Sequence, residues 1–232
     1  TVRVWSTDVL CSAKPEQNAP EDASDDPPPG ALLAVLSNHT AVVTVVRWSN
    51  SGAMLASGSD DKYILLWERR APGAMGAQPF GSTPNAENWC RVAACHGHQM
   101  DVLDVAWAPD DALLASCSID NHVLIWRPPR GPGGGAAGAA AALTPVHRLS
   151  GHTNWVKGVA WDPVGRYLAS SSEDRRVILW RVGDDSAPSW EVEAEVRAPF
   201  EGVSEQAFFQ RLSWSPDGES LCVTNAQKST RP

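Results

Sequence analysis

Serine, histidine and aspartate, the three side-chain types that together perform nucleophilic catalysis, recur in this chain at fixed spacing. A serine lies 18 residues and an aspartate 22 residues after His39, and the same offsets hold from His98 and from His152. A serine activated by a histidine that an aspartate orients is the arrangement used for acyl transfer. An enzyme needs that arrangement once, whereas a structural device is needed in every repeat. The three copies therefore predict architecture, and we expect no catalytic residue.

Tryptophans extend the same pattern, 9 and 28 residues after each histidine. Four residue types held at fixed offsets in three copies indicate an internal repeat. The sets formed with the later tryptophan are His39, Ser57, Asp61 and Trp67; His98, Ser116, Asp120 and Trp126; and His152, Ser170, Asp174 and Trp180.

Short β-strands must position these residues. A turn signal follows the first tryptophan of each repeat, at 49–52, 108–111 and 162–165, and it contains Pro, Asn, Asp or Gly. A strand rich in β-branched and aliphatic residues then ends on the second tryptophan. A fourth strand is expected in each connection, for example at 31–36 or 146–149. The repeats therefore predict antiparallel sheets of four strands.

The repeat resembles the WD40 family, whose members fold as β-propellers. The resemblance implies that each set of four forms a hydrogen-bonded tetrad tying the hairpin to the strand that ends in Trp. Two departures leave the tetrads intact: Glu68, Arg127 and Arg181 replace the usual Asp after the closing Trp, and Asn38 replaces the usual Gly before His39. The expected fold is all-β, a partial WD40 β-propeller with three complete four-stranded blades and partial blades at both ends.

The repeats divide the chain into six segments. We expect the end of a preceding blade at 1–5, a flexible acidic and Pro-rich insertion at 6–30, and a WD repeat at 31–67. Further repeats are expected at 68–126, with a long connection, and at 127–180, with a Gly/Ala-rich loop, before the next blade begins in 181–232. A propeller closes with about 4–8 blades, so the chain is interpreted as a fragment of a seven-bladed propeller. Open sheet edges predict poor stability in isolation.

Composition narrows the classes of partner. The formal net charge of -8 disfavours direct DNA binding and favours basic partners. Five cysteines without a C-x-x-C pair favour a reducing compartment. No signal peptide and no apolar run near 18 residues is found, so no membrane association is expected.

Other motifs that could carry chemistry have plainer interpretations. The run Cys95-His96-Gly97-His98 could suggest zinc, but His98 belongs to a tetrad and no second ligand pair lies at suitable spacing. The glycines of 131–138 precede alanines, so they do not form a phosphate-binding loop. The pairs Arg69-Arg70 and Arg175-Arg176 are interpreted as solvated strand ends. We expect no metal and no cofactor.

Binding is expected on the loops that surround each tetrad. An exposed tryptophan is a good interface anchor, although Trp155 could equally serve blade packing. The candidate partner-binding residues, three or five positions after each histidine or just before each tetrad aspartate, are Val42, Asp60, Asp101, Ile119, Trp155, Lys157 and Glu173.

Several stretches beyond the generic repeat resemble the HIRA histone-chaperone family, namely 47–67, 80–89, 114–126, 156–170 and 208–218. The resemblance implies a nuclear, non-catalytic scaffold for replication-independent deposition of histones H3–H4, with transcriptional repression as a consequence. It also implies a ubinuclein-type partner on the propeller and an ASF1-type chaperone that binds outside this segment.

Two other functions stay open at this point. The p60-type subunit of chromatin assembly factor 1, which acts during replication, shares the residues at 87–89 and 208–213. A WD40 substrate adaptor of a ubiquitin ligase would need basic residues around the central opening, and the net acidity disfavours one that reads phosphorylated motifs. Fold alone does not choose among these functions.

Overall fold

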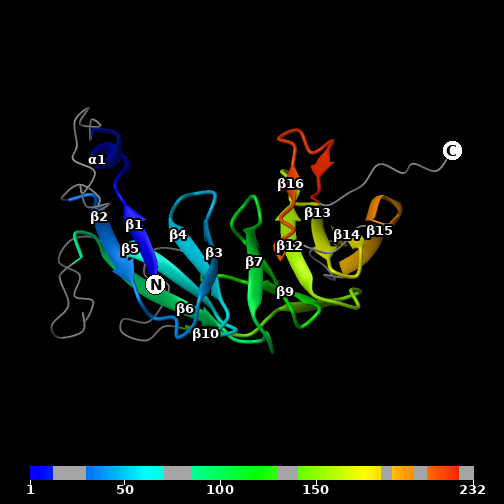
Figure 1. Cartoon of the computed structure of the whole chain (residues 1–232), viewed down its shortest axis with the longest axis horizontal. Helices are drawn as coiled ribbons and strands as arrows, with labels where there is room; N and C mark the ends of the chain where they lie inside the picture. Colours follow the sequence, from blue (N-terminus) through cyan, green and yellow to red (C-terminus); the bar gives the residue numbers. More distant parts are fainter. Residues whose placement is uncertain (13–29, 71–84, 130–140, 184–189, 201–207, 225–232) are drawn as a thin grey trace, which may run out of the picture.

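The computed structural model describes residues 1–12, 30–70, 85–129, 141–183, 190–200 and 208–224. Within these ranges, antiparallel sheets follow one another along the long axis of the molecule (Figure 1). Two sheets contain four strands each, a third contains four strands and a short additional one at its rim, and a two-stranded sheet lies at either end. The predicted all-β fold, with three complete blades between two partial ones, is confirmed.

Each blade is built from strands that follow one another in the sequence, except that one short strand intervenes in the third blade. The first, partial blade consists of β1 (Val2–Trp5) and β2 (Leu32–Leu36). The second consists of β3 (Val43–Trp48), β4 (Met54–Ser59), β5 (Ile64–Arg70) and β6 (Asn88–Cys95), and the third of β7 (Val102–Trp107), β8 (Leu114–Ser118), β9 (His122–Trp126) and β11 (His147–Ser150). The fourth consists of β12 (Val156–Trp161), β13 (Tyr167–Ser172), β14 (Arg176–Val182) and β15 (Trp190–Val196), and the fifth, partial blade of β16 (Ser213–Trp214) and β17 (Leu221–Cys222).

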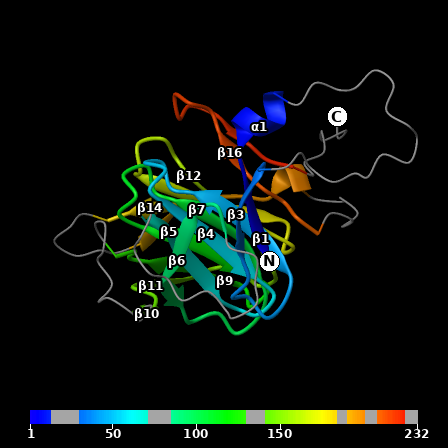
Figure 2. The same ribbon diagram turned by 90° about the vertical axis from the view of Figure 1, so that its left-hand side faces the viewer.

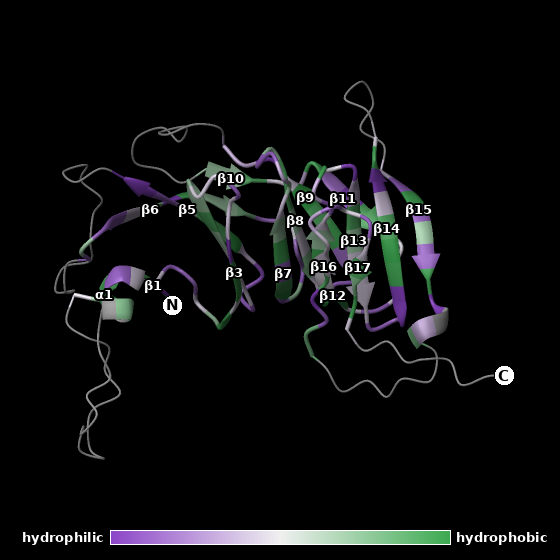
Figure 3. Cartoon of the chain, turned by 90° about the horizontal axis from the view of Figure 1, so that it is seen from above, coloured by the Kyte–Doolittle hydropathy of each residue, from purple (hydrophilic) through white to green (hydrophobic). Residues whose placement is uncertain are grey.

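The first strands of successive blades, β3, β7, β12 and β16, pack against one another along one side of the row (Figure 3). The core lies between the blades. Apolar residues of neighbouring sheets form shared clusters, in which Trp126 and Ile125 are completely buried. Strands such as β7 and β14 are hydrophobic along most of their length (Figure 3), as expected for strands covered on both faces.

The first strand of each complete blade carries a β-bulge at the same place. The register between β12 and β13 shifts between Val156 and Gly158, and equivalent shifts occur after Val43 and Val102. A bulge leaves one residue unpaired and re-aims its side chain. In the fourth blade this residue is Lys157.

The hairpin turns lie where Gly, Pro, Asn and Asp predicted them. Gly52 and Gly165 adopt positive φ angles of 70° and 78°, and their N–H groups donate to Ser49 and Asp162. Asp111 adopts a φ of 58° in the third blade, which is tolerable because Asp is among the residues that enter this region most readily.

Two elements differ from expectation. The segment 6–30 was expected to be a flexible insertion, but its residues 7–12 form helix α1 (Thr7–Ser12). The first turn of the helix carries Asp8, and Ser6 Oγ caps it by accepting the N–H of Val9 at 3.4 Å. The helix lies at the margin of the molecule (Figure 2). Strand β10 (Ala141–Leu143) includes the end of the Gly/Ala-rich run and pairs in parallel with β6. The rest of both predicted segments, 13–29 and 130–140, lies outside the described residues.

None of the helices in the described ranges combines the length and the apolarity that a membrane crossing requires.

Candidate functional site: the repeated tetrad and the face around it

The third blade shows the geometry that the repeated residues adopt. His98 Nδ1 lies 2.9 Å from Asp120 Oδ2, and His98 Nε2 lies 2.7 Å from Ser116 Oγ. The indole N–H of Trp126 donates to the same Ser116 Oγ at 2.8 Å. The second and fourth blades repeat these contacts within a narrow range of distances, among His39, Ser57, Asp61 and Trp67 and among His152, Ser170, Asp174 and Trp180.

Donors and acceptors can be ordered along each tetrad. An indole N–H can only donate and an ionised carboxylate can only accept. The proton on His98 therefore lies on Nδ1 and points to Asp120, while Nε2 accepts from the Ser116 hydroxyl. The resulting chain runs from Trp126 through Ser116 and His98 to Asp120, and each polar atom in it has a partner.

Burial and hydrogen bonding leave the tetrad histidine neutral and the tetrad aspartate ionised. Burial lowers the pKa of His98 and outweighs the opposing effect of Asp120, so the imidazole is neutral. Burial alone would raise the pKa of Asp120, but hydrogen bonds from His98 and from the N–H groups of Gln99 and His122 lower that pKa to about 2. Asp174 follows the same balance, and its pKa is also lowered to about 2.

The serine–histidine–aspartate contacts have the connectivity of a catalytic triad, but the serine is not accessible. Ser57, Ser116 and Ser170 are all completely buried. Each Oγ also accepts an indole N–H. A nucleophile must reach its substrate, so these buried serines are not placed for acyl transfer, and each tetrad joins the parts of its own blade.

The loops around the tetrads bring the candidate binding residues together in pairs. The N–H of Asp60 donates to the carbonyl oxygen of Val42 at 3.0 Å, and the N–H of Glu173 donates to that of Trp155 at 2.9 Å. Asp101 and Ile119 form the equivalent pair in the third blade. These pairs lie at one end of the sheets. We call this end the tetrad face, and it comprises residues 37–42, 59–63, 96–101, 118–122, 151–155 and 172–175.

The candidate binding residues differ in how far their side chains are exposed to solvent. Val42 and Trp155 are exposed, and Asp60 and Asp101 are half-buried. Ile119 packs partly against the core between the third and fourth blades.

The expectation that Lys157 is available to a partner is wrong. Its side chain is buried and forms an ion pair with Glu173, which is therefore also engaged. The reason is the bulge in β12, which places Lys157 out of register and turns its side chain inward. The bulged residue of the third blade, Leu103, is likewise completely buried.

The Cys95-His96-Gly97-His98 run has the structure expected of packing residues. Cys95 is buried in the core, and burial raises the pKa of its thiol. The ring of His96 packs against Tyr63 with centroids 4.7 Å apart, and His98 belongs to its tetrad. Among the described residues, no group of three or more His, Cys, Asp or Glu side chains is arranged to hold a metal ion.

A charged cluster links three blades near the first strands. Asp104 of β7 is buried, with Arg47 of β3 at 3.2 Å and Arg211, just before β16, at 3.5 Å. Burial raises the pKa of Asp104, and the two guanidinium groups partly offset this rise. The Asp104 carboxylate thus serves as the counter-charge of both arginines.

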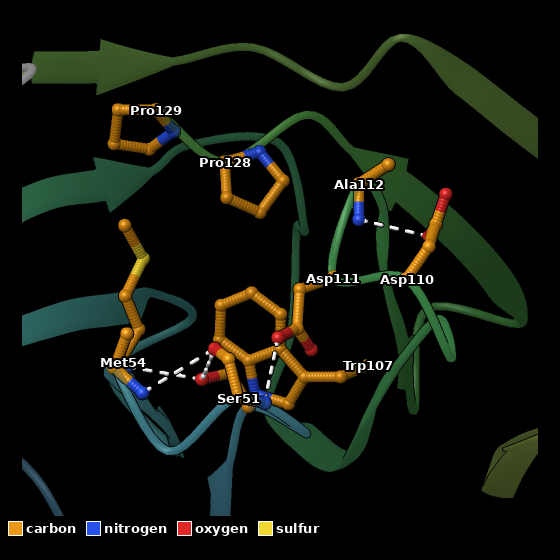
Figure 4. A pocket seen from close by; sticks show the side chains of 10 residues that line it. Ser51, Met54, Trp107, Asp110, Asp111, Ala112, Pro128 and Pro129 are labelled. Carbon is orange, nitrogen blue, oxygen red and sulfur yellow. Dashed lines mark hydrogen bonds between the residues drawn. The ribbon is translucent and has the colours of Figure 1, made fainter. Parts of the chain in front are cut away.

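The opposite end of the sheets, the turn face, comprises residues 49–53, 108–113 and 162–166. A pocket of about 410 Å³ lies there between Met54, Trp107 and Pro128 (Figure 4). Of its two carboxylates, Asp111 accepts hydrogen bonds from the backbone N–H groups of Asn50 and Ser51 at 2.7 and 2.8 Å, and Asp110 accepts one from the N–H of Ala112. The polar groups of this pocket therefore join two turns, and they offer no arrangement for catalysis.

Two clusters were not anticipated from the sequence. The pairing of Asp104 with Arg47 and Arg211 spans three blades, and no short motif encodes it. Phe208, which contacts Trp155 on the tetrad face, and Phe209, which contacts Phe208, could have been suspected because they are two consecutive aromatic residues.

Comparison with known proteins places this geometry in a family. The model of the CAF1B/HIR1 beta-propeller domain matches residues 29–230. The chain is similar to Protein HIR1 of Mycosarcoma maydis, with 38% identity over 97% of this chain, and to Protein hir1 of Schizosaccharomyces pombe, with 34% identity over 97%. It spans only 20% and 22% of the lengths of these relatives.

Among solved structures, a chain in the crystal structure of the Chaetomium thermophilum polycomb repressive complex 2 superimposes with a TM-score of 0.65. The match covers 85% of this chain and 46% of that chain at 21% identity. This likeness concerns the fold.

Proposed function

Because this chain belongs to the CAF1B/HIR1 β-propeller family, we propose that it acts as a WD40 scaffold in a histone-chaperone complex. The complex assembles nucleosomes independently of DNA replication by depositing histones H3–H4, and transcriptional repression is the consequence. The protein acts in the nucleus. The family match over residues 29–230 carries the proposal.

A scaffold role agrees with the tetrad geometry. The buried serines serve architecture, and the side chains left exposed on the tetrad face include Val42, Met100 and Trp155. Apolar and aromatic side chains at an accessible loop face are suited to protein contact. The proposed chemistry of this protein is therefore recognition without catalysis.

The proposed partners follow from the family. A ubinuclein-type subunit binds the propeller, and H3–H4 associates through the complex. An ASF1-type chaperone binds a region outside this segment. The formal net charge of -8 favours basic protein partners over direct contact with DNA.

A second candidate is the p60-type subunit of chromatin assembly factor 1, because the matching family model covers CAF1B and HIR1 together. A ubiquitin-ligase adaptor for phosphorylated motifs is less well supported. The arginines near the first strands, Arg47 and Arg211, already share Asp104, so fewer unpaired cations remain for a phosphate.

The test is affinity purification of the tagged protein from nuclear extract, followed by mass spectrometry. Trp155→Ala is compared with Val164→Ala, a matched truncation of an exposed residue on the turn face. Recovery of H3–H4 with ubinuclein-type and ASF1-type chains is the expected result, with selective loss of the ubinuclein-type chain in Trp155→Ala. Recovery of a replication clamp with large chromatin-assembly-factor subunits would instead establish the second candidate, and cullin-type chains without histones would exclude both.

A further inference from the structure

Three aromatic side chains from distant parts of the sequence form an exposed cluster on the tetrad face. The ring centroids of Trp155 and Phe208 lie 6.4 Å apart, and those of Phe208 and Phe209 lie 5.0 Å apart. All three residues retain substantial exposure, at 41%, 49% and 39% respectively. We call Trp155, Phe208 and Phe209 the aromatic cluster.

Contacts of the two residues that follow Phe209 hold the aromatic cluster in place. The Arg211 guanidinium lies 4.7 Å from the centroid of the Phe209 ring and donates to the carbonyl oxygen of Thr44 at 3.1 Å. The neighbouring carbonyl of Gln210 accepts the hydroxyl of Ser171 at 2.5 Å.

Gly158 permits this close approach, since a Cβ atom there would lie 2.2 Å from the oxygen of Gln210. The aromatic surface is therefore held in place before any partner arrives, which lowers the ordering cost of binding.

The tetrad face also carries two carboxylates, those of Asp101 and Asp60. Asp101 holds the position in the third blade that Trp155 holds in the fourth, directly before first strands that pack together. Asp60 lies close to Asp101: burial raises the pKa of Asp60, and the Asp101 and Asp61 carboxylates raise it further.

In the part of the chain that the structure describes, neither Asp60 nor Asp101 forms an ion pair. Nearby cations are engaged elsewhere: Lys157 pairs with Glu173, Arg211 with Asp104, and Arg176 with Asp174. Lys62 is exposed at the β4–β5 turn but forms no ion pair with either aspartate.

From this combination we infer that the aromatic cluster is the docking site for a polypeptide segment that carries an apolar anchor beside lysine or arginine side chains. The anchor packs on Trp155 and Phe208, and the basic side chains face Asp101 and Asp60. This inference rests on the proposed function, because it specifies the chemistry of one partner of the scaffold. Exposed aromatic residues supply most of the binding energy in such contacts, and the carboxylates select the sign of charge.

The experiment measures binding of a fluorescent synthetic peptide of about a dozen residues, in which two leucines are flanked by lysines. Matched probes replace the lysines with glutamates or the leucines with serines. The protein variants are Trp155→Ala, Phe208→Ala and the paired change Asp60→Asn with Asp101→Asn, and Val164→Ala serves as the control on the turn face.

The lysine–leucine peptide should bind, and Trp155→Ala and Phe208→Ala should each weaken its binding by about 10-fold or more. Val164→Ala should leave the affinity unchanged. The paired asparagine change should weaken binding and flatten its dependence on salt. Trp155→Phe, which retains an aromatic surface, should restore most of the affinity, and circular dichroism should show that each variant is folded.

Equal binding of the glutamate probe would overturn the inference, as would unchanged affinity in the folded Phe208→Ala variant. This outcome is distinguishable from failure of the proposed function. Histone recovery in the affinity purification without peptide discrimination would leave the scaffold role standing alone. Peptide discrimination without histones would retain the docking site and remove the proposed function.

Discussion

Trp161 in β12 donates its indole N–H to the carbonyl oxygen of Ala106 in the preceding blade, at 3.1 Å. Trp107 makes the same bond to Arg47 at 3.2 Å, and Trp214 makes it to Ala160 at 3.1 Å. In each case the acceptor lies one position before the equivalent tryptophan of the preceding blade. Trp107, Trp161 and Trp214 are therefore links between blades, whereas the tetrad is a link within one.

Replacing Trp161 with Phe should lower the free energy of unfolding by about 1–3 kcal/mol, because the Ala106 carbonyl loses its partner in a poorly hydrated seam. Trp48→Phe is the matched control, since Trp48 is 50% exposed and its indole donates no hydrogen bond to a neighbouring blade within the described residues. Its cost should stay within about 0.5 kcal/mol. Urea unfolding measures both, and equal losses would show that the link between blades contributes nothing specific.

Ser116→Ala removes the atom shared by His98 and Trp126. Because both partners are buried, we expect a loss of about 1–3 kcal/mol for each group left without a hydrogen bond. Ser150→Ala, at an exposed position in the same blade, should have almost no effect on the unfolding midpoint. A serine-reactive fluorophosphonate should label neither protein, and labelling of Ser116 would contradict the structural role of the tetrad.

Acid should destabilise the fold in two stages. The folded-state pKa of His98 is lowered from its ordinary value of 6.5, so the unfolded chain binds the proton first and stability begins to fall below that pH. The pKa values of Asp120 and Asp174 are lowered from 3.8 to about 2, so their stabilising effect is present above 3.8 and is lost as pH falls toward 2.

Thermal unfolding followed across this pH range should therefore show a gradual decline and then a steeper one. Asp120→Asn should reduce the steep part, although it also lowers stability at neutral pH. An unfolding temperature that stays constant from pH 6.5 to pH 2 would contradict the assigned charges.

The buried Asp104 gives a prediction about charge compensation. Changing Arg47 and Arg211 together to Met leaves the carboxylate without its cations, and we expect a loss of about 3–5 kcal/mol at neutral pH. Asp104→Asn alone should cost less, because the side chains of Arg47 and Arg211 are 42% and 38% exposed and water can solvate them.

Adding Asp104→Asn to the double Met variant should recover stability, since no buried charge then remains. The double variant should also regain stability as the pH falls, because burial has raised the pKa of Asp104 and its protonation relieves the cost. Chemical denaturation at several pH values measures these differences, and failure of the added Asp104→Asn to rescue would exclude a charge-compensation role.

The sequence allowed the blades to be predicted because each repeat encodes its own hairpins. The turn residues Gly52 and Gly165 mark where strands reverse, and the offsets of His98, Ser116 and Trp126 place them at bonding distance once the strands pair in register. These relationships span fewer than thirty residues, so periodicity captures them.

Relationships between blades were not accessible in the same way. The position of Lys157 depends on a bulge, which shifts one side chain out of the alternating pattern. The contact between Phe208 and Trp155 joins segments about fifty residues apart through the packing of two blades. Its formation depends on which strands pack together, and spacing within one repeat carries no information about that packing.

Strand β10 adds backbone hydrogen bonds to the seam between the second and third blades. Residues 141–143 belong to the connection between β9 and β11 of the third blade, yet they are paired with β6 at the outer rim of the second. Near the first strands, the Thr44 hydroxyl also donates to the carbonyl of Val102 across this seam.

Separating these two blades would therefore require backbone hydrogen bonds to break at the rim as well as contacts to open near the first strands. Among the described strands, no such rim pairing joins the third blade to the fourth. We therefore expect the second and third blades to move as a unit and bending of the row to concentrate at the junction beyond them.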